Sequence, residues 1–175
     1  MTVRVGFVSS EGGPYLIADA ASARNWRGID GPDYDELCSQ MDAHTDGVLN
    51  EFRLPSSTLL TWEPGAGVAD VLVDTGRVVL AHPSDARVEL PASMDLVGID
   101  VMVESGVLAI LWAPENGECI KDQDFAIQKA RPPSGLLAVD GSSLLVPVVS
   151  GIYRCSIFSN GIDGQNVSCV VMLRK

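Results

Sequence analysis

The sequence predicts a mainly β fold with two short helices, arranged as an antiparallel sheet, a sandwich or a partly open barrel. Short apolar or alternating segments recur at intervals of roughly 8–12 residues, which is typical of sandwiches and barrels. Turn residues such as Thr75-Gly76 and Ser105-Gly106 separate these segments. The 175 residues contain no interior linker, repeat or low-complexity segment, so we expect residues 1–175 to form a single domain.

Alternation of side chains predicts the first strand. Val3, Val5 and Phe7 alternate with Arg4 and Gly6, so one face of this strand is expected to be buried. Alternating or continuous apolar segments predict the strands that follow. Their expected ranges are residues 15–18, 47–54, 58–62, 70–74, 77–82, 96–104, 107–112, 124–131, 136–140, 151–159 and 167–174.

The clearest helical signal spans residues 32–43. Pro32 suits the first helical position, and acidic residues fill the first turn, where the helix dipole stabilises negative charge. Apolar residues recur at positions i, i+3, i+4 and i+7, which places them on one face. These apolar residues are Tyr34, Leu37, Cys38 and Met41.

A shorter helix is expected over residues 20–26. Asp19 precedes it, and a carboxylate at that position can accept hydrogen bonds from the unpaired N–H groups of the first turn. We therefore expect Asp19 to cap this helix, and Trp26 at its end to pack against the sheet.

The chain is strongly acidic. It has 12 Lys plus Arg against 23 Asp plus Glu, a formal net charge of −11, while its hydrophobic fraction of 46% is that of a folded domain. Because phosphate contacts require Lys and Arg, we expect no nucleic-acid partner and no membrane partner. The charge is uneven: residues 1–120 hold 19 acidic and 6 basic residues, whereas residues 121–175 hold 4 and 6.

The densest acidic stretch, residues 28–52, contains no Lys or Arg. One interpretation is a solvated surface, part of which is ordinary chemistry of a helix N-terminus. The other is a surface that meets a cationic patch on a partner protein, because complementary charge speeds encounter and selects partners. The candidate partner-binding residues are Asp30, Asp33, Asp35, Glu36, Asp42, Asp46 and Glu51. A second acid-only stretch, residues 88–120, is a weaker candidate through Asp95, Asp100 and Glu104.

Targeting signals and cysteines point to the cytoplasm. The first residues lack the apolar core and cleavage site of a signal peptide, and no apolar run approaches the roughly 20 residues that span a bilayer. The four widely spaced cysteines show no metal-ligand pattern. Cys155 and Cys169 are symmetric about Ile162 in an expected hairpin, so they are either buried thiols or a pair facing each other across two strands.

Motifs of catalysis are absent from the sequence. The two histidines, His44 and His82, lie far apart, and no nucleophile elbow, phosphate loop, zinc motif or calcium loop accompanies them. We therefore expect no metal and no cofactor. An alternative hypothesis remains open: paired carboxylates, with tryptophans such as Trp26, Trp62 and Trp112 lining a cleft, would suit a small β enzyme acting on carbohydrate.

The N-terminal third resembles the immunity protein 21 family of bacterial toxin–immunity systems. The resemblance covers roughly residues 8–60 and fades afterwards. In that family a Ser-Gly-Gly-Pro segment precedes an apolar strand, and here Glu11 interrupts the corresponding run. The segments that carry the resemblance are Ser9-Ser10-Glu11-Gly12-Gly13-Pro14-Tyr15-Leu16-Ile17, Asn25-Trp26-Arg27-Gly28-Ile29 and Asp33-Tyr34-Asp35-Glu36-Leu37-Cys38.

The resemblance implies neutralisation of a toxin and no enzymatic activity. Such a protein binds a cognate toxin in the cytoplasm, and a toxin with a basic substrate cleft would give the acidic surface a physical role. The turn residues and buried aromatic residues of the family pattern are then scaffold, while the exposed acids make the contacts. The oligomeric state does not follow from the sequence.

Overall fold

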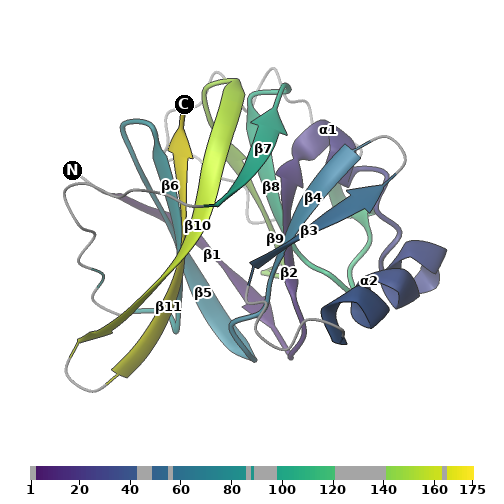
Figure 1. Cartoon of the computed structure of the whole chain (residues 1–175), viewed down its shortest axis with the longest axis horizontal. Coiled ribbons are helices and arrows are strands. Elements are labelled where there is room, and N and C mark those ends of the chain that lie inside the picture. The colour runs from purple at the N-terminus through teal and green to yellow at the C-terminus, as the bar shows by residue number, and fades with distance from the viewer. Residues whose placement is uncertain are drawn as a thin grey trace.

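The computed structural model describes residues 3–42, 49–54, 57–85, 88, 98–120, 141–162 and 165–175, which form a sandwich of two antiparallel sheets (Figure 1). The six-stranded sheet has the order β1-β5-β6-β11-β10-β7, and the five-stranded sheet has the order β3-β4-β2-β8-β9. Neither sheet closes on itself over these residues, so the predicted mainly β fold is confirmed as a sandwich. The six-stranded sheet comprises β1 (Val3–Ser10), β5 (Gly67–Asp74), β6 (Arg77–His82), β11 (Gln165–Arg174), β10 (Gly151–Ile162) and β7 (Ile99–Val103). The five-stranded sheet comprises β3 (Leu49–Leu54), β4 (Ser57–Trp62), β2 (Tyr15–Asp19), β8 (Val107–Trp112) and β9 (Ser143–Pro147).

The main core lies between the two sheets. Alternate side chains of each strand point into this layer. Val71 and Leu80 enter from the six-stranded sheet and Ile17 and Ile110 from the five-stranded sheet, and all four are fully buried. Burying one such side chain stabilises the fold by roughly 1.5–3 kcal/mol.

Helices cover the outer face of the five-stranded sheet (Figure 1). They are α1 (Ala20–Ala23), the 3-10 helix η1 (Gly28–Asp30) and α2 (Pro32–Asp42). Leu16 and Leu111 of the sheet share a buried cluster with Trp26 and Leu37. Both faces of this sheet are therefore shielded from solvent. For this reason β2 and β8 have continuous apolar runs in the sequence.

Most predicted strands over the described residues are confirmed, with shifted ends. The buried face expected in β1 is wrong: Val3 and Phe7 are 40% and 42% exposed and Val8 is buried, and the register of β1 against β5 shifts between Arg4 and Gly6. Within the expected range 96–104 the structure has β7, Ile99–Val103, and within 47–54 it has β3, Leu49–Leu54; residues 47, 48, 96 and 97 lie outside the described residues. Strand β9 is not among the predicted strands, because Pro147 interrupts its apolar run. Pro147 stands at the end of an edge strand, where a missing N–H is tolerated. The strands expected at 124–131 and 136–140 lie outside the described residues.

The predicted cap at Asp19 is wrong. Helix α1 is a single turn, Ala20–Ala23, and Asp19 makes no side-chain hydrogen bond to it. The Asp19 Oδ1 atom instead accepts hydrogen bonds from the backbone N–H and the hydroxyl of Ser105, at 2.9 and 2.5 Å. The carboxylate lies at the end of β2, next to the β7–β8 turn, and this turn offers it two donors.

The possible pairing of Cys155 with Cys169 is also wrong. Across the β10–β11 hairpin, Cys155 faces Met172 and Cys169 faces Phe158. Cys155 points into the layer between the sheets, whereas Cys169 belongs to a cluster on the outer face of the six-stranded sheet. Both are buried free thiols, because the centre of the hairpin lies beyond Ile162.

Candidate partner-binding surface

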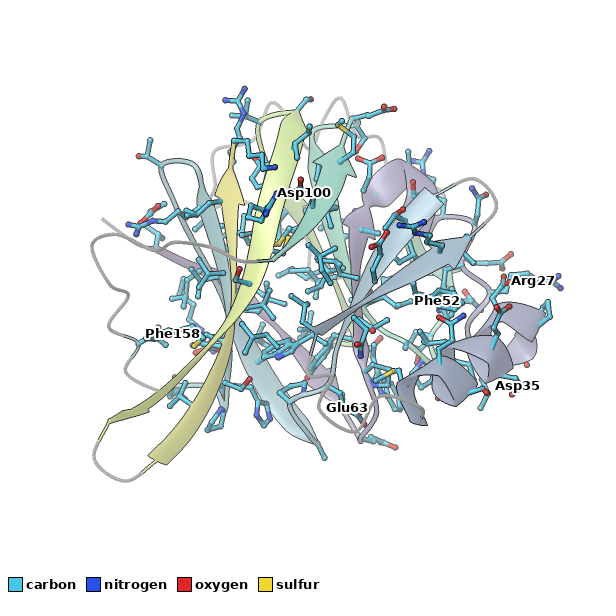
Figure 2. The ribbon with its side chains drawn as sticks, viewed as in Figure 1. Arg27, Asp35, Phe52, Glu63, Asp100 and Phe158 are labelled. Carbon is cyan, nitrogen blue, oxygen red and sulfur yellow. The ribbon has the colours of Figure 1, made fainter. Side chains whose placement is uncertain are left out.

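Helix α2 presents the central part of the candidate surface. Its apolar face is the predicted one: Leu37 is fully buried, and Tyr34 and Met41 are half-buried against the outer face of the five-stranded sheet. The opposite face consequently points to solvent. Asp35 and Glu36 are exposed there, and in Figure 2 Asp35 lies on the outer side of α2, away from the sheets.

A close backbone contact fixes the position of η1, which carries the first residue of the candidate surface. In η1 the Ile29 N–H donates to the carbonyl of Pro114 at 3.0 Å. Gly28 adopts a φ of +60°, and a Cβ there would lie 2.3 Å from the same carbonyl oxygen, so only glycine permits the approach. The neighbouring Asp30 is exposed and is carried on this anchored turn.

The other predicted residues divide into three cases. Asp33 is half-buried in the first turn of α2. Glu51 lies on the edge strand β3 and forms an ion pair with Arg53, with Oε1 and Nε 2.8 Å apart. Asp42 ends α2, but its side chain is not described, and Asp46 lies outside the described residues. The structure thus brings Asp30, Asp33, Asp35 and Glu36 together at one end of the molecule, with Glu51 on a neighbouring strand already partnered.

Carboxylates on the six-stranded sheet have cationic partners. Arg4 and Arg77 bind Asp70 and Asp74, each with a shortest N–O distance of 2.5 Å. Asp100, named above as a weaker candidate, accepts from Arg154 and from Lys175. These two cations hold the pKa of Asp100 below its usual range, chiefly through the hydrogen bond from Arg154.

The candidate surface differs in this respect. Asp30, Asp33 and Asp35 form no ion pair within the described part of the chain, and Glu36 accepts one hydrogen bond, from the neutral amide of Gln40. Arg27 is the nearest cation before η1, and it is exposed. Figure 2 shows Arg27 at the same end of the molecule as Asp35. Negative charge is therefore in excess beside α2, where four carboxylates without an ion-pair partner among the described residues lie at the same end of the molecule as Arg27.

A small cavity lies under α2 that sequence reasoning did not anticipate. Its volume is about 80 Å³, and its lining includes Gln40 of α2, Asn50 of β3 and Thr61 of β4. The Thr61 hydroxyl is fully buried and has no hydrogen-bond partner among the described residues. A cavity of this size and polarity accommodates ordered water. The sequence feature that could have indicated this cavity is Thr61, a polar residue between the apolar residues Leu60 and Trp62.

The residues expected to carry catalysis or sugar binding are placed as follows. No three His, Cys, Asp or Glu side chains among them gather closely enough to bind a metal ion. Trp26 and Trp62 are buried, and Trp112 is half-buried, with its indole N–H donating to the carbonyl of Gly12 at 2.7 Å. His44 lies outside the described residues, and the Nε2 atom of His82 is 3.1 Å from the carbonyl oxygen of Ala66. These tryptophans pack the fold and do not line a sugar-binding cleft.

A scan against models of known protein families gives no match, and searches of curated proteins and of solved structures give none either. Within the described ranges, no helix combines the length and apolar character needed to cross a bilayer.

Proposed function

We propose that the protein is an immunity-type inhibitor, which binds and neutralises a cognate bacterial toxin in the cytoplasm. One observation carries the proposal: exposed carboxylates beside α2 have no cationic partner among the described residues, whereas Asp70, Asp74 and Asp100 of the six-stranded sheet each have one. An uncompensated acidic surface steers a basic partner and aligns it on encounter. The resemblance of residues 8–60 to the immunity protein 21 family implies that this basic partner is a toxin.

The cytoplasmic setting is part of the same proposal. Cys38, Cys155 and Cys169 are free thiols. Free thiols are usual in reducing compartments, whereas secreted domains commonly pair their cysteines. We expect the inhibitor to act in the cytoplasm, where the toxin would otherwise damage the cell that produces it.

The alternative, a small carbohydrate-active enzyme, has less support. Its chemistry requires two carboxyl groups roughly 5–9 Å apart in one cleft. The cavity near the β5–β6 turn contains one carboxylate, Asp74, and the cavity under α2 also contains one, Glu51. Each of these carboxylates is also paired with an arginine of its own hairpin or strand.

The test first identifies a toxin domain encoded by a neighbouring gene and then uses that domain as the binding partner. The double variant Asp35→Lys/Glu36→Lys reverses two charges on α2. The control, Asp85→Lys, reverses one exposed acid that contacts Asp70 and Arg4 on the six-stranded sheet, and it is matched with the single variant Asp35→Lys. We expect the α2 variant to associate about tenfold more slowly at low salt and to protect cells poorly, while the control behaves as wild type. Circular dichroism and thermal unfolding check that the variants fold.

Two results would oppose the proposal. Full protection and an unchanged association rate with the α2 variant would show that the interface lies elsewhere. If the wild-type protein neither binds nor neutralises the neighbouring toxin domain, the inhibitor function itself is wrong.

A further inference from the structure

A larger cavity opens at the opposite end of the sandwich from α2. Its volume is about 510 Å³. It lies between the β5–β6 turn and the loop that joins β9 to β10, near the C-terminal end of β11 (Figure 1). Cavities of roughly 300–1,000 Å³ are the usual size of small-molecule sites.

The walls of this cavity are mostly aliphatic. Val73 and Val78 line it from the β5–β6 hairpin, and Val148 and Val149 line it from the β9–β10 loop. The Tyr153 hydroxyl donates to the carbonyl of Val149 at 2.8 Å, which holds the loop against β10. The apolar surface is therefore displayed by a loop that is fixed in position before any ligand arrives.

The charges at the cavity do not cancel. Asp74 lines it, but its side chain is only 6% exposed and is bound by the guanidinium of Arg77 through three hydrogen bonds. This pair is close to neutral as a unit. The remaining charge comes from Arg174, which is exposed and has no carboxylate partner among the residues that the structure describes.

Arg174 lies beside two segments that border the cavity, although it is not itself one of the lining residues. Its backbone N–H donates to the carbonyl of Gly76 at 3.1 Å, which ties it to the β5–β6 turn. Its Nε atom lies 3.1 Å from the position that a Cβ on Gly151 would take, so its side chain extends along the start of β10. Its positive charge also acts on Tyr153, where it opposes the rise in pKa that burial causes. An aliphatic cavity with a guanidinium near Tyr153 and the start of β10 is complementary to an apolar body that carries one negative charge.

We propose that this cavity binds a small amphipathic carboxylate, with its apolar chain among the valines and its carboxylate at Arg174. The assignment is independent of toxin binding, because the cavity and α2 lie at opposite ends of the molecule (Figure 1). Octanoate is a suitable probe, and 1-octanol has the same chain without the charge.

The first experiment measures binding of the two probes to the full chain by calorimetry and by NMR shifts of the Tyr153 and Val149 amides. For a ligand of this size we expect octanoate to bind with a dissociation constant of about 1 mM or tighter, and octanol to bind more weakly. Failure of octanoate to bind below about 10 mM would overturn the proposal. Tighter binding of octanol than of octanoate would refute the role of Arg174.

Adjacent residues provide a matched pair of charge variants. Arg174→Gln removes the guanidinium at the cavity, whereas Lys175→Gln removes a charge that pairs with Asp100 on the outer face of the sheet. We expect Arg174→Gln to weaken octanoate binding about three- to tenfold, because the ion pair is only partly shielded from water. Octanol binding should be unchanged by either variant. Equal effects of the two variants on octanoate would indicate a general charge effect and would contradict a specific contact.

Filling the cavity provides a second, steric test. Val73→Phe places a larger side chain in the wall, and Val149→Trp does so from an exposed loop position that is 59% accessible and tolerant of change. We expect each to weaken both probes about tenfold or more. Because Val149→Trp alters a loop, it remains informative if Val73→Phe fails to fold. Undiminished octanoate binding in a folded Val149→Trp variant would place the probe elsewhere and overturn the assignment.

Discussion

Asp19 and Ser105, 86 positions apart in the sequence, are joined by two hydrogen bonds to one carboxylate oxygen. Asp19 ends β2 of the five-stranded sheet, and Ser105 stands in the turn after β7 of the six-stranded sheet. The Ser105 hydroxyl also accepts a hydrogen bond from the Val107 N–H at 3.1 Å. This nearly buried carboxylate therefore links the two layers of the sandwich at one end.

The first prediction concerns this link. Asp19→Ala should lower the free energy of unfolding by about 2–3 kcal/mol, because hydrogen bonds to a charged group are lost and buried donors are left unpaired. Asp30→Ala, which removes an exposed acid, should change stability by less than about 0.5 kcal/mol. Urea unfolding of the two variants measures the difference. Equal stabilities would show that the link contributes nothing.

The second prediction concerns glycine. A Cβ on Gly98 would lie 1.8 Å from the backbone carbonyl oxygen of Cys155, whereas a Cβ on Gly6 would meet only the flexible end of Leu144 at 2.9 Å. Gly98→Ala should therefore cost about 3 kcal/mol or more, and Gly6→Ala about 1 kcal/mol. Thermal unfolding compares them. A Gly98→Ala protein as stable as Gly6→Ala would contradict the close approach of these backbones.

The third prediction concerns the thiols. Burial raises the pKa of Cys155 to about 12 and that of Cys169 to about 11. At pH 8 almost no thiolate forms at either residue, and neither is accessible, so iodoacetamide should leave both unmodified in the folded protein. Cys38 is half-buried in α2 and should react faster. Peptide mapping after timed labelling, with a urea-unfolded sample as the reference, identifies the modified residues. Rapid labelling of Cys155 in the folded protein would be the contrary outcome.

The fourth prediction concerns pH. Arg154 and Lys175 lower the pKa of Asp100 in the folded state. The stabilisation is therefore fully present above the unfolded pKa of about 3.9, and it is lost as the pH falls through the lower folded value. Asp100→Asn should lower the melting temperature at pH 7 but have little effect near pH 2, and added salt should shrink the difference at pH 7. A difference that persists at pH 2 would indicate a structural role unrelated to charge.

Local patterns explain why parts of the structure were predictable. Helix α2 could be predicted from the spacing of Tyr34, Leu37 and Met41. A helix that buries one face repeats its apolar residues at this spacing. In β7, Val101 and Val103 are buried and Met102 is exposed, as the alternation of side chains along a strand requires. Such features depend only on residues close together in the chain.

Long-range partners were not predictable in the same way. That Asp100 meets Arg154 depends on β7 pairing with β10, and strand order leaves no local signal in the sequence. Glu51 is different, since residues i and i+2 of a strand share a face, and its pairing with Arg53 follows once the strand is assigned. Of the two alternatives for Cys155 and Cys169, buried thiols are confirmed and the cross-strand pair is wrong, because the register of a hairpin is set by its turn and not by the symmetry of two cysteines.

The order of the six-stranded sheet has a consequence for synthesis of the protein. Strands β1, β5 and β6 form one half of the sheet and β10 and β7 the other, and β11 stands between β6 and β10. As the nascent chain leaves the ribosome, β6 has a bare edge until β11 emerges. An unpaired apolar strand edge can pair with another chain. The nascent protein is therefore most prone to aggregation, and most dependent on chaperones, in the interval before β11 emerges.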